Sequence, residues 1–283
     1  MHQSARYTTL YLIKMKPDNI QEGAKILLND TAKILNDNAV NYIIVGGWSP
    51  YLLNSTEIKH PGTKDVDILF ENAYKPEELK GIISKFIEAG FILSAKHDFQ
   101  LFKKIPVRNF EFIYNIDILH PSETTWETDI FIDHIELDVP KDEFQDENFK
   151  MKSIMLPDSN FLFDGHYSKY ELSDNTSINL MNELGCILTK SKSVNIEKRF
   201  RDSLDIFLAI HQCRDYDSLV TSTLKLRSDN QPVYNSLYGI REAFENSTLF
   251  MNSRRYTDIP KENFDHTISK FFKDTKLNLP ASN

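Results

Sequence analysis

Two aspartates separated by one residue carry the clearest chemical signal in this sequence. Asp65 and Asp67 lie at the start of the apolar run 66–70, which is typical of a buried strand. Side chains at positions i and i+2 of a strand point to the same face, about 6–7 Å apart. Two like charges at the edge of a core cost free energy unless a cation or another partner neutralises them. The pattern therefore favours a divalent metal site over a hairpin end with two hydrated acids.

A pair of glycines upstream adds an independent signal. Gly46 and Gly47 follow the apolar run 42–45, which predicts a buried strand, and precede a short predicted helix. Glycine tolerates positive φ and lets a ligand approach the backbone closely. A strand–glycine–helix junction also offers free N–H groups to phosphate oxygens. Ser49, two residues later, is either a phosphate-binding hydroxyl or an ordinary first-turn helix residue.

A third aspartate, Asp117, lies near the end of the predicted strand 110–119. Alternation along a strand places one set of side chains on each face. One set is Glu111, Ile113, Asn115 and Asp117, and the other is Phe112, Tyr114, Ile116 and Ile118. If the second set forms the core, Asp117 faces a cleft. We favour that position over the alternative of a strand-end acid before the dipeptide at 120–121.

These motifs resemble a known family. The segments 46–49 (Gly-Gly-Trp-Ser) and 62–67 (Gly-Thr-Lys-Asp-Val-Asp) resemble the signature of the nucleotidyltransferase superfamily, which has the DNA polymerase β-like fold. That fold requires a third carboxylate on an adjacent strand, for which Asp117 is the candidate. The segment 198–206 resembles the Arg-x-Arg/Lys-Asp-x-x-Asp-Ile helix of the abortive-infection, AbiEii-type nucleotidyltransferase toxins. The resemblance covers roughly residues 38–210.

The resemblance implies an α+β fold in two domains. Residues 1–165 would form a catalytic domain, a nucleotidyltransferase-like mixed sheet with flanking helices, and residues 166–283 would form a helical bundle. The implied reaction is metal-dependent transfer of a nucleoside monophosphate from a nucleoside triphosphate to an acceptor hydroxyl. Mg²⁺, or alternatively Mn²⁺, suits the oxygen ligands. The implied catalytic and metal-binding residues are Asp65, Asp67 and Asp117, and the implied nucleotide-binding residues are Gly46, Gly47, Ser49 and Lys190.

The acceptor and partners stay open at this stage. A toxin of this type would modify RNA, with tRNA favoured, or a protein, and a cognate antitoxin would accompany it. The alternatives are a small-molecule acceptor, as in aminoglycoside-modifying relatives, and a catalytically silent protein that binds a nucleotide or a partner. Asp202 and Asp205 fit either a site or a salt-bridged helix surface. His60 is expected to be a loop histidine.

Length and charge limit the hypotheses about domains, acceptor and location. The chain has 283 residues, which favours two domains, and a net charge of −8. Residues 1–184 hold 18 Lys+Arg and 29 Asp+Glu, whereas residues 185–283 hold 15 and 12. The basic second part suits RNA, and the acidic first part would suit a cationic drug. No apolar run reaches the ~20 residues that span a bilayer, and the N-terminus lacks a signal-peptide pattern, so we expect a cytoplasmic protein.

The remaining elements follow from hydrophobic periodicity. Helices are predicted over 18–38, 76–89, 177–189 and 196–212, with further helices over 215–275. A hairpin is predicted over 91–95 and 99–105, a strand pair over 130–132 and 135–137, and a strand over 153–157. Residues 142–147 are predicted to form a solvated acidic loop, and the two cysteines to be reduced core residues.

Overall fold

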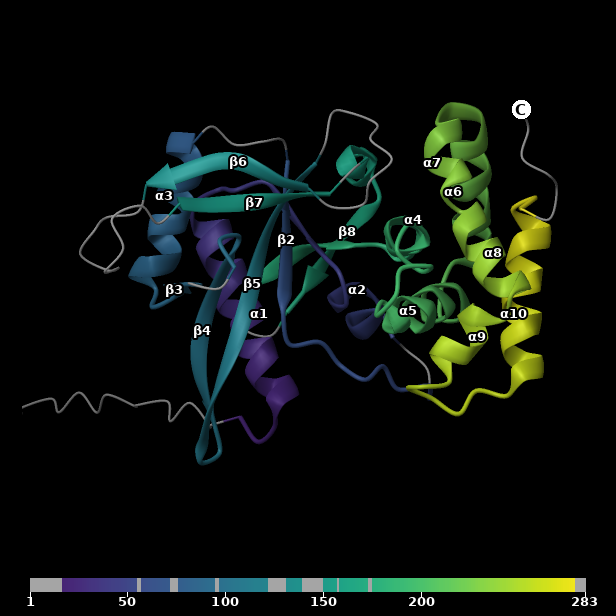
Figure 1. The fold of residues 1–283 in the computed structure, drawn as a ribbon, viewed down its shortest axis with the longest axis horizontal. Helices are drawn as coiled ribbons and strands as arrows, with labels where there is room; N and C mark the ends of the chain where they lie inside the picture. Colours follow the sequence, from purple (N-terminus) through teal and green to yellow (C-terminus); the bar gives the residue numbers. More distant parts are fainter. Residues whose placement is uncertain are drawn as a thin grey trace, which may run out of the picture.

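The computed structural model describes residues 17–54, 57–71, 76–94, 97–121, 131–138, 150–156, 158–172 and 175–277. A mixed sheet with flanking helices forms one part of the molecule, and helices from the C-terminal half form the other (Figure 1). The mixed α+β class predicted from the sequence is therefore confirmed. The predicted acidic loop at 142–147 lies outside the described residues.

The sheet runs in the order β3-β4-β5-β2-β1-β9-β8, and β7 pairs with both β5 and β6. Its strands are β1 (Tyr42–Val45), β2 (Val66–Phe70), β3 (Ile92–Leu93), β4 (Gln100–Val107), β5 (Phe110–Pro121), β6 (Phe131–Asp138), β7 (Lys150–Leu156), β8 (Tyr167–Glu171) and β9 (Ser177–Met181). At its centre β2 pairs antiparallel with β1 and parallel with β5. The two strands that carry the predicted carboxylates are therefore neighbours in the middle of the sheet.

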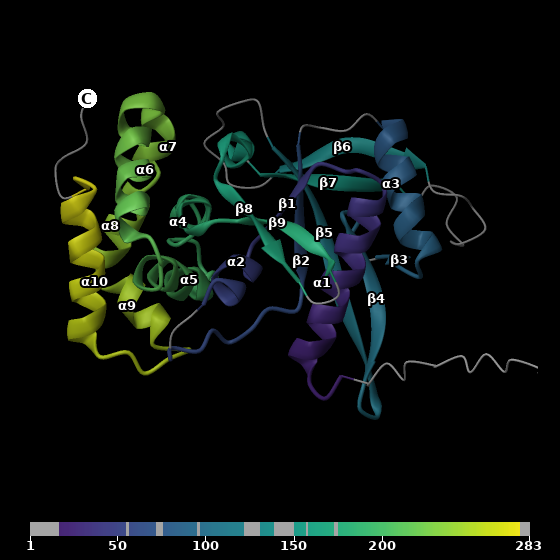
Figure 2. The same cartoon turned by 180° about the vertical axis from the view of Figure 1, so that it is seen from behind.

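The described helices are α1 (Ile20–Asp37), α2 (Trp48–Leu52), α3 (Pro76–Glu88), α4 (Glu183–Ser191), α5 (Phe200–His211), α6 (Tyr216–Asp229), α7 (Gln231–Asn235), α8 (Tyr238–Glu245), α9 (Thr248–Ser253) and α10 (Lys261–Asp274), with a short 3₁₀ helix η2 (Ser159–Asp164). Helices α1 and α3 lie against the sheet, and α4 to α10 gather at its other side (Figure 2). No described helix combines the length and the apolar character needed to cross a membrane.

Two hydrophobic cores divide the faces of the central strands. Tyr42 and Ile44 of β1 pack into a core with α1 and α3, whereas Ile43 and Val45 pack into a core with α4 to α10. Side chains of a strand alternate between faces, and Leu69 of β2 belongs to the second core. The side chains two and four positions before Leu69 therefore face the helical part. These positions hold Asp67 and Asp65, two of the three predicted metal ligands.

Three local predictions are wrong. The segment 177–181 is strand β9 and not the start of a helix, because Ile178 and Leu180 alternate into the α1/α3 core and Leu180 pairs with Ile44 of β1. The predicted pair 130–132 and 135–137 is one strand, β6, with an irregular register between Asp133 and Leu137. The helix predicted to begin at 196 begins at 200.

The predicted hairpin and the helices over 18–38 and 76–89 are confirmed as β3–β4, α1 and α3. The predicted domain boundary does not coincide with the end of the sheet, because β8 and β9 follow residue 165 and pair with each other and with β1. The division into a catalytic domain and a helical domain at that residue stays a prediction.

Candidate active site

The register of the central strands brings two of the predicted carboxylates side by side. Asp67 of β2 lies directly opposite Asp117 of β5 in a parallel pair. Neighbouring strands are about 4.8 Å apart, so these side chains meet on the face toward the helices. Asp65 precedes β2 on the same face, and its carboxylate receives a hydrogen bond from the Asn115 side chain. The structure therefore gathers all three aspartates.

Neighbouring side chains fix two of the aspartates. The Gln100 side-chain amide donates to Asp117 Oδ1 at 2.7 Å, and the Trp48 indole donates to the Asp65 carbonyl at 2.9 Å. Asp65 Oδ1 is buried without a hydrogen-bond partner among the described residues. A buried carboxylate oxygen without a hydrogen-bond partner costs free energy, and a bound cation would remove that cost.

Burial raises the pKa of each carboxyl in this cluster, and repulsion from neighbouring carboxylates adds to the rise at Asp67 and Asp117. Burial, followed by the charge of Asp65, raises the pKa of Asp67 to about 6, although Lys190, Arg201 and Arg199 oppose the shift. Burial and the charge of Asp67 raise the pKa of Asp117 to about 7. Burial also raises the pKa of Asp65. The nearby described cations therefore do not fully offset the effects that disfavour the charged form of these carboxyls.

These shifts predict that the protein loses stability as the pH rises. The folded chain binds protons at Asp67 and Asp117 more tightly than the unfolded chain, in which carboxyls titrate near 3.8. Their contribution is intact below about pH 4 and is lost as the pH passes through about 6 to 7. Asp117→Asn should therefore be the more stable protein at pH 8, by on the order of 2 kcal/mol.

Urea unfolding of the wild type and of Asp117→Asn at several pH values between 4 and 8, without divalent ions, would measure this difference. Equal slopes of unfolding free energy against pH in the two proteins would contradict it.

Gly46 lets the turn approach the cluster. Its φ is +70°, and a Cβ there would lie 1.9 Å from Asp67 Oδ2. Gly47 serves packing instead, because a Cβ there would lie 2.7 Å from Arg201 Nη2. Of the two glycines, only Gly46 lines the adjoining cavity.

Gly46→Ala should displace the Asp67 carboxylate and strain the backbone. We expect a loss of about 1–3 kcal/mol in the free energy of unfolding, the usual cost of a non-glycine residue held in a sparsely populated conformation. Chemical denaturation would measure it. Gly81→Ala is the matched control, because a Cβ at that helical glycine meets no atom within 4 Å. Equal stability of the two variants would show that the turn adjusts freely.

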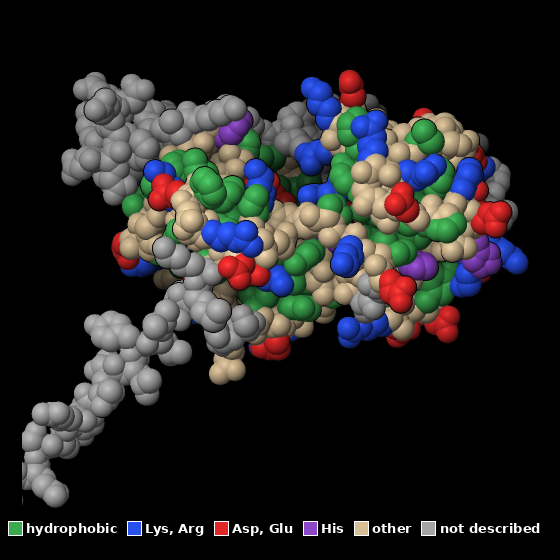
Figure 3. All heavy atoms as spheres, turned by 90° about the horizontal axis from the view of Figure 1, so that it is seen from below, with side chains coloured by type: hydrophobic (Ala, Val, Ile, Leu, Met, Phe, Trp, Pro, Cys, Tyr) green, Lys and Arg blue, Asp and Glu red, His purple; other side chains and the backbone are tan. Residues whose placement is uncertain are grey.

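A cavity of about 550 Å³ opens beside the aspartates. Asp67 and Asp117 lie in its wall, as do the cationic residues Lys190, Lys192 and Arg199. Apolar side chains from β5, β7 and η2 form another part of the wall, namely Leu119, Ile154, Leu156 and Phe161. Figure 3 shows Lys and Arg side chains around a hollow between the sheet and the helices. The cavity thus combines acidic, basic and apolar surfaces.

Lys190 is buried and already paired. Its Nζ lies 2.8 Å from Asp202 Oδ1 and 2.8 Å from Asp205 Oδ2. Burial alone would lower the pKa of Lys190, but the two carboxylates raise it well above the ordinary value. Burial alone would raise the pKa of Asp205, but Lys190 and His60 bring it down to about 2. Lys190 is therefore held charged at the cavity wall by the two aspartates of α5, whose charge it offsets.

Ser49 does not join the other predicted site residues. Its side chain is fully buried in α2 and lines a small void with Leu208 and Ala209, not the cavity beside the aspartates. Arg199 is the functional candidate that sequence analysis missed. It is exposed at the cavity wall, and its charge lowers the pKa values of Asp67 and Asp117. The signal was present, because Arg199 is the first residue of the Arg-x-Arg-Asp motif.

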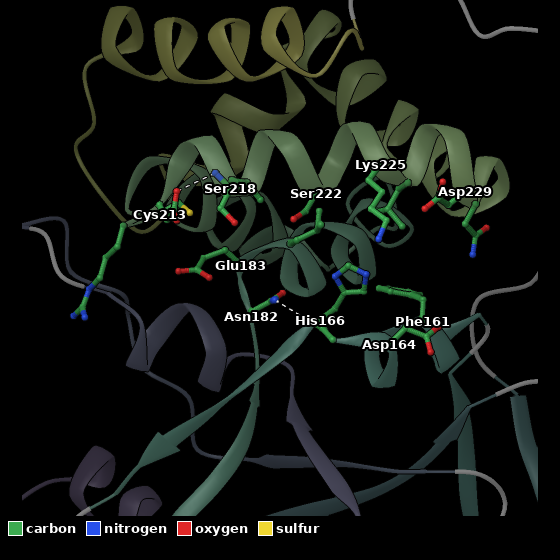
Figure 4. Close-up of a pocket in the computed structure, with 17 residues that line it drawn as sticks. Phe161, Asp164, His166, Asn182, Glu183, Cys213, Ser218, Ser222, Lys225 and Asp229 are labelled. Carbon is green, nitrogen blue, oxygen red and sulfur yellow. Dashed lines mark hydrogen bonds between the residues drawn. The ribbon is translucent and has the colours of Figure 1, made fainter.

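A second cavity, of about 570 Å³, lies between α6 and the segment 161–166 (Figure 4). The Lys225 side chain points toward the His166 ring there, and burial lowers the pKa of His166. The seven predicted site residues are all described, and none of them lines this cavity. Among the described residues of the whole chain, no group of three or more His, Cys, Asp or Glu side chains could by itself hold a metal ion.

A comparison with solved structures finds similarity to a chain of low sequence identity. The structure is similar to the crystal structure of an antigenic nucleotidyltransferase-like protein from Paracoccidioides brasiliensis, with 13% sequence identity and a TM-score of 0.34, over 78% of this chain and 94% of that chain. No protein-family model matches this chain. No curated protein matches it either. A similarity at this TM-score carries no functional argument, so function must be inferred from the side chains.

Proposed function

We propose that this protein is a nucleotidyltransferase that moves a nucleoside monophosphate from a nucleoside triphosphate to an acceptor hydroxyl. The observation that carries the proposal is the pairing of Asp67 with Asp117 across β2 and β5, beside Asp65 and at the edge of a cavity whose wall also holds Arg199, Lys190 and Lys192. The motif spacing that resembles the nucleotidyltransferase superfamily, and within it the AbiEii-type toxins, supports the same reading.

Asp65, Asp67 and Asp117 would hold Mg²⁺ or Mn²⁺. The raised pKa values of Asp67 and Asp117 and the unpartnered Asp65 oxygen fit carboxylates that bind a cation. Mg²⁺ is usually bound by one or two carboxylates together with substrate phosphates, not by an all-protein cage. This explains why no complete set of protein ligands is needed before the nucleotide binds. When bound, the metal would neutralise charge on the phosphates.

The chain's own residues would position the substrates. Gly46 lets the backbone at the cavity wall lie close to the Asp67 carboxylate, and Arg199 at the same wall suits the triphosphate. Lys190 adds fixed charge behind them. Asp117, opposite Asp67 in the sheet and in the wall of the cavity, is placed to accept the proton of the acceptor hydroxyl.

We propose RNA as the acceptor, and the resemblance to AbiEii-type toxins further implies a cognate antitoxin as a partner. The exposed residues Lys198 and Arg199 precede α5, and the Arg255 guanidinium stacks on Phe200 at 3.8 Å. Basic side chains beside a cavity suit a polyanionic acceptor.

Label transfer tests the proposal. Purified protein would be incubated with Mg²⁺, total cellular RNA and each α-labelled nucleoside triphosphate in turn, with Asp65→Asn as the inactive control. Label in an RNA band that is absent with the variant would support the function and identify the nucleotide. Label on protein alone would show that the acceptor is a protein and not RNA. The absence of label from RNA, protein and small molecules would overturn the proposed function.

A further inference from the structure

His60 is buried within the segment that leads into the two aspartates. Its side chain is 1% exposed, and its Nδ1 accepts the backbone N–H of Gly62 at 3.0 Å. With Nδ1 acting as an acceptor, the ring proton of the neutral imidazole resides on Nε2. Nε2 lies 2.9 Å from Asp205 Oδ1 and therefore donates to it. His60 thus connects the segment before β2 to helix α5.

Asp205 is anchored from the other side as well. Its second carboxylate oxygen meets Lys190 of α4 at 2.8 Å, and Lys190 also meets Asp202. Ser193 Oγ in turn donates to Asp202 Oδ2 at 2.6 Å. The network therefore joins three elements around the cavity: the segment before β2, the end of α4 and the first turns of α5.

Two further contacts hold the same segment. Arg201 of α5 donates from Nη1 to the Gly62 carbonyl at 3.3 Å. The Gln21 side chain of α1 accepts from the Thr63 N–H at 3.0 Å and donates to the Thr63 carbonyl at 3.1 Å. Gly62 is required there, because its φ is +94° and a Cβ would lie 2.1 Å from Gln21 Oε1. The segment 60–63 is thus held from α5 on one side and from α1 on the other.

We propose that His60 is a positioning residue, which with Asp205 fixes the segment 60–64 and so sets the direction of the Asp65 and Asp67 side chains. This inference rests on the proposed nucleotidyltransferase function. His60 does not line the cavity beside the aspartates, so it acts through the backbone and not by contact with substrate. Positioning matters here because a misplacement of about 1 Å can cost ~10²-fold in rate.

Three variants separate the two hydrogen bonds of the ring. His60→Ala removes both. His60→Gln retains a donor at the reach of Nε2 and loses the acceptor for Gly62, whereas His60→Asn retains an acceptor near Nδ1 and loses the donor for Asp205. His166→Ala is the matched control, because that half-buried histidine lies in the second cavity.

The first readout does not depend on activity. Amide hydrogen exchange at Gly62 should be about tenfold faster in His60→Ala, since the lost hydrogen bond no longer protects that N–H. Exchange at Ile44 and Ile68, in the sheet core, should stay within about twofold of the wild type. Unchanged exchange at Gly62 would overturn the inference whether or not the protein transfers nucleotides.

The second readout is kinetic. If the wild type transfers nucleotides, kcat of His60→Ala should fall by about tenfold or more with KM for the triphosphate within about twofold, and His60→Gln should recover part of the loss. Full kcat in folded His60→Ala would overturn the inference. If the wild type does not transfer nucleotides, the proposed function is refuted. Hydrogen exchange at Gly62 would then be the only test of the positioning role.

Discussion

Replacement of Asp67 by asparagine should reduce kcat for nucleotidyl transfer by about 10³-fold. Asp67 is the central carboxylate of the cluster, opposite Asp117 in the sheet and two residues from Asp65. Loss of its charge would weaken binding of the metal, which stabilises the transition state by several kcal/mol. Each 1.36 kcal/mol of lost stabilisation lowers the rate tenfold. Transfer from an α-labelled nucleoside triphosphate at saturating Mg²⁺ would measure the loss.

The same variant should remain folded. Asparagine has nearly the volume of aspartate, and its neutral amide removes the charge repulsion that raises the pKa of Asp117. We therefore expect thermal unfolding at or above the wild-type temperature. Asp158→Asn is the matched control, because Asp158 lies in the wall of the same cavity but pairs with Lys192 at 2.7 Å. Near-wild-type rates in Asp67→Asn, or equal losses in the two variants, would contradict the assignment.

The centre of the sheet was predictable because each strand there carries its own pattern. The run 42–45 is apolar throughout, and its four side chains are buried, two in each core. The alternation of 110–119 placed Tyr114, Ile116 and Ile118 in the core, as the structure confirms. These patterns are local, so a single sequence contains them.

The strand β9 was not predictable in the same way. Ile178, Met181, Leu184 and Leu188 recur at helical spacing, although Ile178 and Leu180 also alternate as in a strand. Pairing of Leu180 with Ile44, which lies more than 130 positions earlier, decides between the two. Tertiary contacts of this kind override local propensity, and the sequence pattern alone does not reveal them.

The site shows the same division between local and distant information. The Asp-x-Asp spacing and the position of Asp117 on its strand predicted which side chains share a face. The partners of His60 and Lys190 were not predictable, because His60 reaches across 145 positions to Asp205. A salt-bridged helix surface was nearly as good an interpretation of Asp202 and Asp205 as a site, yet both residues are buried. Their burial follows from the packing of α5 against α4.

Replacement of Lys190 by methionine should destabilise the protein by about 3–5 kcal/mol. The change leaves Asp202 and Asp205 in the interior without their common counter-charge. Removal of one partner from a buried ion pair costs about this much, because the other charge stays buried and unpaired. Methionine fills a similar volume, so a cavity contributes little to the loss. Urea unfolding at neutral pH would measure it.

Two comparisons make this prediction specific to charge. Lys192→Met, two residues away, removes a lysine whose partner Asp158 is more exposed, so the loss there should stay below about 1 kcal/mol. Adding Asp205→Asn to Lys190→Met should recover at least about 1 kcal/mol, because it removes a buried charge whose nearest remaining cation is Arg201 at 3.7 Å, while hydrogen bonding to His60 is kept. Equal losses of unfolding free energy in the two lysine variants, or a further loss in the double variant, would contradict the prediction. Lys190 would then stabilise the fold by packing and not by neutralising Asp202 and Asp205.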